Sequence, residues 1–597
     1  MDKKYKEQIS IHEKIVNEYS KKSNMIGNLK LLLCLILVAI VIFRFSDGIQ
    51  MFFPVTVIFI VLAFLWAYHA KIIAKLERSK ILIKINQKYL SRIDGTWIQF
   101  KDNAEEFANP EHRYACDLDI VGEKSLFQLL NVANTYYGRE RFVKDLLESD
   151  YSQQELLKRQ EAIAELSKDI LFSNEFQYIS SQIKPNKDVE ILLENLKKDS
   201  KFINNNILRV ILKYLPLVTV PFIALTLIFQ VSSLYAVAVN VVMLQLFMWI
   251  FGVLKMIVYF SSVGAAQYSL NNYSKLLEFI QTKDFESDVL KEVKTKLVND
   301  AKSAATAIAE LEKIMQRINL RYNTLLYIIL NAFLLWDYEC AFSLEKWKLK
   351  YAREAELWFR AIAEFESLLS FSNLSNINEN TCFPNITLNH QQKNIYSAKN
   401  LGHPLLSNDG RIYNDIDIDG NILIISGSNM SGKTTFLRTV GINLVLAQAG
   451  CCVCADNMSN SIFKIATSMR ITDDLGNGVS TFYAELKKIK TIIDICQEHN
   501  NTLFLIDEIF RGTNSVDRLE GARAVLTNLH ELSVAGLITT HDLELCSLSE
   551  TKNFLNFSFS EYYENNEIKF DYKIKAGKST TTNAKYLMEM IGIRRSE

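Results

Sequence analysis

The chain has 597 residues, in which 67 Lys and Arg residues balance 67 Asp and Glu residues. This length exceeds what one hydrophobic core supports and predicts about three or four domains. The zero net charge excludes a global basic field for nucleic acid, although a local basic groove remains compatible with it.

The N-terminal region predicts a membrane hairpin. An apolar stretch at 29–43, interrupted only by Lys30, is followed by a short link at 44–50 and a second apolar stretch at 51–70. About 20 helical residues cross a ~30 Å hydrocarbon layer, so the second stretch is long enough, and the first is adequate once its flanks are counted. A cleaved signal peptide is the alternative, but the first stretch begins late and leads straight into another apolar segment.

A second hairpin is predicted at 214–229 and 234–254, joined by an uncharged turn at 230–233. The alternative is a buried helical pair in a soluble domain, against which the combined length and the near absence of charge argue. Lys and Arg residues flank both hairpins but are almost absent from their turns. By the positive-inside rule, both chain ends and all large soluble parts are cytoplasmic, which predicts a multi-pass protein of the cell (inner) membrane.

The regions between and after the hairpins have helical character. The whole chain has only seven prolines, and a seam of apolar residues at helical spacing predicts a helix packed on a partner. The seam consists of Ile308, Leu311, Met315 and Ile318. The apolar run 325–336 is too short to span a membrane and is expected to be helix core or to rest on the membrane surface. Residues 375–420, rich in Asn and turn formers, predict the entry to another domain.

Residues 427–435 read Gly-Ser-Asn-Met-Ser-Gly-Lys-Thr-Thr and fit the phosphate-loop pattern G-x-x-x-x-G-K-[ST]. A strand-like run at 421–426 precedes the loop and a helical pattern at 435–449 follows it, which argues against a chance Gly-rich turn. In such a loop, backbone N–H groups surround the β-phosphate of a nucleotide, Lys433 reaches the β/γ oxygens and the Thr434 hydroxyl binds Mg²⁺. The predicted nucleotide-binding residues of the loop are Gly427, Ser428, Asn429, Met430, Ser431, Gly432, Lys433, Thr434 and Thr435.

Two carboxylates follow a second strand-like run. Residues 503–506 predict a buried parallel strand that ends in Asp507 and Glu508, at the sheet edge beside the phosphates. Asp507 would hold Mg²⁺ through water, and Glu508 would polarise the water that attacks the γ-phosphate. The alternative is a surface acidic pair after a core strand.

The nine cysteines are scattered apart from Cys451, Cys452 and Cys454. These three lie in a short apolar run with no second ligand pair at zinc-like spacing, so a buried strand is predicted there and no metal site. Reduced thiols fit a cytoplasmic location.

Asn429 and Met430 inside the loop resemble the variant used by the MutS family of DNA mismatch-binding ATPases. Further matches follow in the family's order: Gly402-His403-Pro404, Tyr413-Asn414-Asp415, Ser480-Thr481-Phe482 with Glu485, Asp507-Glu508-Ile509 with Arg511-Gly512-Thr513 and Asp517, and Thr540-His541. A weaker likeness to the start of the family's helical core is carried by Asp117-Leu118-Asp119, Ser125-Leu126-Phe127, Asn131, Thr135, Gly138-Arg139 and Arg159-Gln160, and residues 358–372 resemble the end of its lever. The resemblance is strong over 380–593 and weaker over 110–200, and the hairpins have no counterpart in ordinary soluble members.

The resemblance implies a homodimer that binds and hydrolyses ATP with Mg²⁺. Ser480 would reach the γ-phosphate of the opposing subunit, Asn429 would contact the phosphates, and His541 would hold or sense the attacking water. A hydrogen-bonded histidine at a strand end is the structural alternative for His541. Lys433, Glu508 and His541 are thus the expected catalytic residues, and Thr434 and Asp507 the expected metal ligands. The adenine contact is left to Tyr413, Arg411 or another residue.

The sequence departs from the family at several positions. Phe510 stands where the family has Gly, and Asn514 where it commonly has Ser. The N-terminal 110 residues contain no Phe-x-Glu motif of the mismatch-reading domain, and the second hairpin occupies the chain between the lever halves where a clamp domain would lie.

The expected fold is a multidomain α plus α/β architecture with two transmembrane helical hairpins, a helical core and lever, and a C-terminal P-loop ATPase domain with a mainly parallel sheet. The expected boundaries are 1–80 for the N-terminal segment and first hairpin, 81–205 for the core, 206–258 for the second hairpin, 259–375 for the lever and 376–597 for the ATPase domain. Two functions fit: a membrane-anchored ATPase that grips DNA, mismatched or branched, or one that transmits its stroke to the bilayer or a membrane partner. A scaffold without ATPase activity is disfavoured because Lys433, Thr434, Asp507 and Glu508 are all present.

Overall fold

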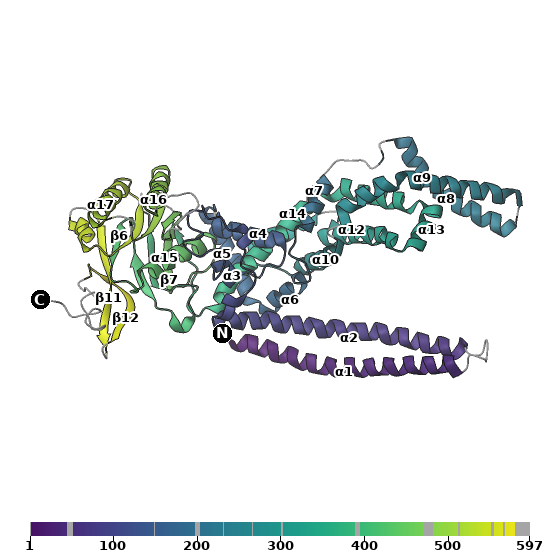
Figure 1. The fold of residues 1–597 in the computed structure, drawn as a ribbon, viewed down its shortest axis with the longest axis horizontal. Helices are drawn as coiled ribbons and strands as arrows, with labels where there is room; N and C mark the ends of the chain where they lie inside the picture. The colour runs from purple at the N-terminus through teal and green to yellow at the C-terminus, as the bar shows by residue number, and fades with distance from the viewer. Residues whose placement is uncertain are drawn as a thin grey trace. The chain divides into compact units, whose positions relative to one another are not determined.

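The computed structural model describes residues 2–43, 52–148, 150–197, 203, 205–230, 232–264, 267–299, 302–387, 394–470, 481–510, 514–550, 554–564 and 567–579. The described chain is mostly helical and contains sheets with parallel strands (Figure 1). It divides into two compact units. The first unit contains residues 1–131, 143–178 and 369–597, and the second contains 132–142 and 179–368.

The helices and strands follow one another along the chain without a cis peptide bond among the described residues. The helices are α1 Asp2–Phe43, α2 Phe52–Ile93, α3 Leu126–Leu130, α4 Tyr136–Leu147, α5 Gln153–Lys168, α6 Ile170–Ser180, α7 Asp188–Lys197, α8 Asn206–Phe229, α9 Ser232–Gly264, α10 Gln267–Thr282, α11 Asp288–Lys296, α12 Ala304–Asn319, α13 Thr324–Leu334, α14 Trp336–Ile377, α15 Lys433–Gln448, α16 Thr481–Glu498 and α17 Ser515–Glu531. The strands are β1 Val298–Asn299, β2 Lys302–Ser303, β3 Asn385–Thr387, β4 Tyr396–Leu401, β5 Asn414–Asp417, β6 Ile422–Ser426, β7 Asn457–Ser461, β8 Lys464–Ser468, β9 Thr502–Asp507, β10 Ala535–Thr540, β11 Phe554–Glu564 and β12 Glu567–Ala576.

In the first unit, α1 and α2 run side by side as a long hairpin (Figure 1). Each helix has 42 residues, so each is about 63 Å long at 1.5 Å per residue. The apolar stretches expected at 29–43 and 51–70 form only the ends of these helices beside the turn, where their large side chains are exposed. At the opposite end, Tyr5 is buried and stacks on Tyr89 with the ring centroids 4.6 Å apart. The hairpin is therefore apolar at its tip and anchored at its base.

In the second unit, α8 and α9 form the second apolar hairpin, and α13 packs against both. Among the described residues, four helices are long and apolar enough to cross a membrane, namely α1, α2, α8 and the portion of α9 from Leu234 to Ser261. The run 325–336, expected to be too short to span, forms α13 and bends by 80° into α14. Taken together across the bend, α13 and α14 are a further candidate for a broken or re-entrant membrane segment.

The C-terminal part of the first unit contains, within the described residues, a six-stranded sheet of order β12-β11-β6-β10-β9-β8. Its strands are parallel except for β12, which pairs antiparallel with β11 at one edge. Every residue of β6, β9 and β10 is buried, which matches the apolar runs of a sheet covered on both faces. Helices α15 and α16 contact strands of this sheet, and a four-stranded sheet of order β3-β7-β4-β5 lies in the same unit.

Two sequence expectations about packing have different outcomes. The seam residues Ile308, Leu311, Met315 and Ile318 are all buried in α12, which packs on α10. The cysteine cluster is also buried, but the expected strand is wrong, because only Val453 forms an isolated bridge, with Cys382. Its backbone is satisfied by the preceding helix instead, since the N–H groups of Cys451 and Cys454 donate to Leu446 O and Asn443 Oδ1. Among the described residues, no group of three or more His, Cys, Asp or Glu side chains could hold a metal ion.

Candidate nucleotide-binding site

The phosphate loop connects the end of β6 to the first turn of α15, so successive backbone N–H groups point out of the N-terminus of a helix. Gly427 and Gly432 have φ angles of 151° and 100°, which glycine adopts without strain. A Cβ atom on Gly427 would lie 2.7 Å from the carbonyl oxygen of Phe559, and one on Gly432 would lie 3.0 Å from the ring of Tyr572. The two glycines therefore let the loop turn tightly beneath β11 and β12.

Lys433 is buried at the first position of α15. Its ammonium group donates to the carbonyl oxygens of Gly427 and Ser428 at 2.9 and 2.8 Å, and it lies 3.5 Å from Nε2 of His541. The loop carbonyls thus hold the cation at the mouth of the helix, where a phosphate group could exchange for them.

Thr434 and Asp507 meet beside this loop. The Thr434 hydroxyl donates to Asp507 Oδ2 at 2.9 Å, and the hydroxyl of Thr539 donates to Asp507 Oδ1 at 2.5 Å. Parallel pairing of β9 with β10 places Thr539 opposite Asp507, which explains the second bond. Hydroxyl and carboxylate oxygens are the ligands that Mg²⁺ prefers, and the ion keeps several of its waters, so two protein oxygens at one point are sufficient.

Glu508 and His541 form the second polar pair at this sheet edge. Their side chains approach to 2.5 Å, between Oε1 of Glu508 and Nε2 of His541. Glu508 has a positive φ of 51° and its N–H donates to the carbonyl and hydroxyl oxygens of Thr539 at 3.2 and 3.1 Å. A left-handed non-glycine residue held by two bonds is typical of a functional site where strain is stabilised by its surroundings.

The turn that carries His541 is held by an ion pair that sequence reasoning missed. Arg518 on α17 donates from Nε and NH2 to the two carboxylate oxygens of Asp542 at 2.8 and 3.0 Å. The hydrogen bond with Asp542 raises the pKa of Arg518. The bidentate geometry restricts the turn directly after β10, so it positions His541.

A cavity of about 470 Å³ joins these groups, which is a size typical of small-molecule sites. Its lining comes from the phosphate loop, Glu508 and several residues outside both motifs. The residues are Leu401, His403, Leu406, Gly410, Ile412, Asn414, Asn429, Met430, Ser431, Gly432, Lys433, Thr434, Thr435, Phe436, Thr439, Glu508, Phe559 and Tyr572. The loop residues Asn429 to Thr435 thus lie in one cavity with Glu508, while Ser428 donates to Glu561 Oε2 at 3.0 Å.

Neither sequence candidate for the adenine contact lines this cavity. Arg411 is buried, and its NH2 donates to Asn378 Oδ1 at 2.7 Å and to Leu406 O at 2.5 Å. The Tyr413 ring packs on Gly402, where an added Cβ would lie 2.8 Å from it. Because these contacts occupy both side chains, Arg411 and Tyr413 support the loop that carries Ile412.

The apolar wall of the cavity offers another surface for a base. Ile412 is 40% exposed and Tyr572 is 43% exposed, and both line the cavity together with His403. Burial lowers the pKa of His403 to about 3, so this imidazole is neutral at physiological pH. A neutral, largely apolar wall suits a purine ring better than a charged one.

Some expected residues cannot be compared with the geometry. Ser480 and the motif Arg511-Gly512-Thr513 lie outside the described residues. The two departures beside that motif are accounted for. Phe510 is buried against Gly521 and lies 5.7 Å from the ring of Phe482, and Asn514 caps α17 by accepting from Asp517 N at 2.9 Å.

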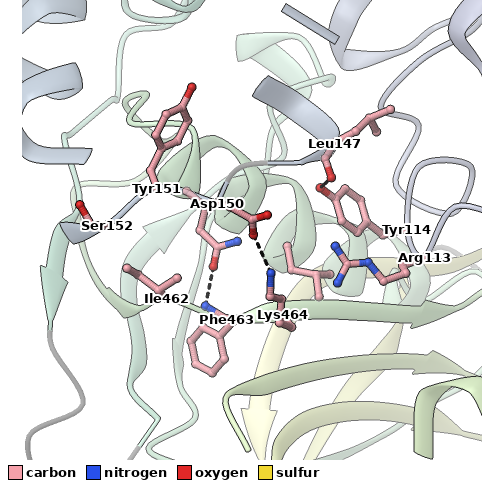
Figure 2. Close-up of a pocket in the computed structure, with 11 residues that line it drawn as sticks. Arg113, Tyr114, Leu147, Asp150, Tyr151, Ser152, Ile462, Phe463 and Lys464 are labelled. Carbon is pink, nitrogen blue, oxygen red and sulfur yellow. Dashed lines mark hydrogen bonds and ion pairs between the residues drawn. The ribbon is translucent and has the colours of Figure 1, made fainter. Parts of the chain in front are cut away.

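A second cavity of about 330 Å³ in the same unit has a different character. Figure 2 shows Arg113, Tyr114 and Asp150 facing β8 across it. Asp150 pairs with Lys464 at 2.6 Å, and the Tyr114 hydroxyl donates to Leu147 O at 2.8 Å. Because these polar groups bond to one another, the cavity is best described as a joint between the helical core and the sheet.

The phosphate-loop geometry at the carboxyl edge of a mainly parallel sheet is the feature that the comparisons with known proteins address. Residues 423–595 match the family model described as MutS domain V. This part of the chain is similar to MutS. The DNA mismatch repair protein MutS of Listeria welshimeri is 32% identical over 246 residues, which cover 40% of this chain and 28% of that protein. The MutS of Lactobacillus gasseri is 30% identical over 266 residues, covering 43% of this chain and 30% of that protein.

The MutS of Halalkalibacterium halodurans is 32% identical over 212 residues, which cover 34% of this chain and 24% of that protein. The chain therefore spans less than a third of the length of these curated relatives. The similarity to MutS supports the resemblance carried by the phosphate-loop motifs, and it concerns the C-terminal part of the chain.

Proposed function

We propose that residues 376–597 form a MutS-like ATPase domain that binds and hydrolyses ATP with Mg²⁺. The observation that carries this proposal is the convergence of Lys433, Thr434, Asp507, Glu508 and His541 at one sheet edge around a cavity of about 470 Å³. ATP would supply a γ-phosphate whose transfer to water releases free energy for movement.

Each side chain has a distinct role in this proposal. The helix N-terminus and Lys433 bind the phosphates, and Thr434 and Asp507 hold Mg²⁺ directly or through water. Glu508 orients and polarises the attacking water, and His541 holds Glu508 and senses the γ-phosphate. Ser480 reaches the γ-phosphate of the opposing subunit in a homodimer.

Substitution of Glu508 by Gln tests the assignment. We expect ATP turnover to fall by roughly 100-fold or more because the base is removed, while nucleotide binding persists. Phosphate release measures turnover, a fluorescent ATP analogue measures binding, and light scattering measures an ATP-stabilised dimer. Glu544→Gln, at an exposed position three residues after His541, is the matched control and should keep full turnover. Unchanged turnover in Glu508→Gln would contradict the role assigned to Glu508.

Contacts within the first unit support coupling of this site to the first hairpin. Arg438 on α15 donates to Asp119 at 2.9 Å, and a Cβ on Gly441 would lie 2.7 Å from Leu118. Farther along the same core segment, the carbonyl of Leu129 accepts from Arg92 of α2 at 2.6 Å. We infer that closure of the ATPase dimer moves α15, and with it the helical core and α2.

We infer further that the two apolar hairpins anchor the chain in the cell membrane with the ATPase domain in the cytoplasm. Single-cysteine variants at Gln230, between α8 and α9, and at Glu498, at the end of α16, should differ in labelling by an impermeant reagent on intact cells. Labelling at position 498 but not at position 230 before lysis would overturn this orientation.

DNA is the proposed load because the similar relatives are DNA mismatch repair proteins. A movement transmitted to the bilayer or to a membrane partner is the alternative, since the similarity covers only the C-terminal part. Binding of the detergent-solubilised full chain to duplex, mismatched and branched DNA, with and without ATP, separates the two. Affinity that falls steeply with salt supports DNA as the load, and absence of such affinity assigns the movement to the membrane.

A further inference from the structure

A basic pocket lies at the base of the second hairpin, entirely within the second unit. It has a volume of about 370 Å³ and is lined by Arg209, Lys213, Phe342, Lys346, Leu349 and Lys350. Four of these six side chains are cations. Nothing in the proposed ATPase function uses this pocket.

The cations come from two helices in matching pairs. Arg209 and Lys213 are one turn apart on α8, and Lys346 and Lys350 are one turn apart on α14. Residues four apart share a helix face, so each helix presents a pair to the same space. The pocket therefore concentrates positive charge from both sides.

One of the four cations is already compensated. Arg209 donates from NH1 and NH2 to the two carboxylate oxygens of Glu345, at 3.0 and 2.8 Å, and its guanidinium lies 5.2 Å from the ring centroid of Phe342. For Lys213, Lys346 and Lys350, no carboxylate partner is found within the part of the chain that the structure describes. Three positive charges are left to face an incoming anion, with a fixed arginine behind them.

The pocket lies where a membrane surface is expected. Lys213 directly precedes Tyr214, the first residue of the apolar stretch 214–229, and Tyr is enriched at membrane–water interfaces. The α8 surface beyond it is apolar and exposed, with Leu217 and Val218 both 67% exposed. Leu349, in the pocket lining, is 71% exposed.

This combination selects a lipid over a small soluble anion. A free phosphate needs the cations but gains nothing from exposed leucine and valine side chains. An anionic phospholipid uses both, because its phosphate meets the lysines while its acyl chains cover the apolar face of α8. Basic pockets between membrane helices on the cytoplasmic side are suited to such headgroups.

We propose that the pocket of Arg209, Lys213, Lys346 and Lys350 binds the headgroup of an anionic phospholipid of the cytoplasmic leaflet, such as phosphatidylglycerol. This rests on the proposed membrane insertion of the second hairpin. Since two of the cations belong to α14, a bound lipid connects the hairpin to the helix that continues toward the ATPase sequence. The lipid composition of the membrane thereby acts on the position of α14.

The test is native mass spectrometry of the full chain in detergent, titrated with phosphatidylglycerol or with phosphatidylcholine of the same acyl chains. The wild type should bind phosphatidylglycerol more tightly. The double variant Lys346→Gln/Lys350→Gln should lose roughly 10- to 30-fold of that affinity, because each cation near the headgroups contributes a few-fold, while phosphatidylcholine binding stays unchanged.

Two further variants make the result specific. Lys291→Gln/Lys313→Gln removes the same charge from exposed positions on α11 and α12 and should bind phosphatidylglycerol as the wild type does. Lys346→Arg/Lys350→Arg keeps the charge and should retain affinity. Equal loss in the control pair, or no loss in Lys346→Gln/Lys350→Gln, overturns the proposal.

The remaining arms separate the possible ligands. Excess glycerol 3-phosphate should not displace the lipid, and displacement would reassign the pocket to a soluble phosphate. Loss of duplex DNA affinity without loss of phosphatidylglycerol affinity in Lys346→Gln/Lys350→Gln would reassign it to nucleic acid. Alkaline extraction of membranes is the independent check: release of the wild type contradicts membrane anchoring, whereas retention with no preference for phosphatidylglycerol contradicts only the lipid pocket.

Discussion

The two apolar hairpins are fixed to their own units by opposite chemistry. At the base of the first, the buried Arg92 of α2 donates to the carbonyl oxygens of Leu129 and Asn131, so a cation holds backbone acceptors of the core. At the base of the second, the buried carboxylates of Glu345 and Asp337 on α14 accept from the hairpin helices. The first hairpin is thus joined to core backbone, while the second is braced helix to helix.

This difference has a mechanical consequence. A helix whose end is bonded to core backbone follows that core as a rigid strut. Helices braced by side chains can slide or tilt while their bonds exchange partners, as in small shear movements of packed helices. We therefore expect the first hairpin to report movement of the ATPase unit directly and the second to respond through α14.

The largest effect that distinguishes the two hairpins is expected at Arg92. Arg92→Met removes two charge-assisted bonds and leaves buried carbonyl oxygens, so the free energy of unfolding of the first unit should fall by about 4 kcal/mol. Thermal unfolding of the detergent-solubilised chain measures this loss. Arg78→Met is the control on the same helix: its pair with Glu175 is half-exposed, and its loss should cost about 1 kcal/mol or less. Similar losses at both positions would remove the distinction.

The second unit should show a pH dependence through another buried carboxylate of α14. Glu366 accepts from the N–H groups of Asn134 and Thr135 at 2.9 and 3.3 Å and from the Thr135 hydroxyl, and burial raises its pKa to about 7. Because this folded-state pKa exceeds the ordinary value of 4.5, the folded chain keeps a proton that the unfolded chain has lost between those two values. Stability from this group is therefore present below pH 4.5 and decreases as pH rises to about 7, by roughly 3 kcal/mol in total.

Glu366→Gln checks this dependence because the amide keeps its shape and cannot ionise. The unfolding temperature of the second unit should fall less between pH 5 and pH 8 in the variant than in the wild type. Glu364→Gln on the same helix removes a carboxylate that pairs with Lys296 near the surface and should keep the wild-type slope. A Glu366→Gln variant that keeps the wild-type slope contradicts the assignment.

Local patterns in the sequence were sufficient for the phosphate loop and for the strands around it. The loop expected at 427–435 lies between β6 and α15, and the run 503–506 lies in the buried strand β9 that ends at Asp507. Such motifs are contiguous, so one stretch of chain carries the whole signal. The apolar tips of the hairpins were equally visible from composition, although their roles remain predictions until the membrane is tested.

Contacts between distant segments could not be predicted in the same way. Thr539 reaches Asp507 only through the register of β10 on β9, and Tyr572 covers Gly432 only because β12 lies at the sheet edge. Arg411 illustrates the reverse case: its position in the sequence suggested a base contact, whereas loop carbonyls occupy its guanidinium. The one available signal was Thr539 itself, a hydroxyl at a strand end directly before the matched Thr540-His541.

The smallest expected effect concerns the inside of the second hairpin. The buried Gln245 of α9 donates from Nε2 to the Thr219 hydroxyl of α8 at 2.9 Å, and such bonds between membrane helices contribute about 1 kcal/mol. Gln245→Leu should therefore increase the hydrogen-exchange rate of α8 amides about fivefold. Asn240→Leu is the control, because the exposed Asn240 bonds to Ala236 O on its own helix at 2.8 Å and should leave α8 unchanged.

Thr219→Val completes the comparison as a double-mutant cycle with Gln245→Leu. If the bond braces α8 against α9, the double variant should exchange little faster than either single variant, because both remove the same interaction. Additive effects of the two substitutions would show that Thr219 and Gln245 act independently. In that case packing alone would hold the second hairpin together, and the contrast with the backbone-bonded first hairpin would become sharper.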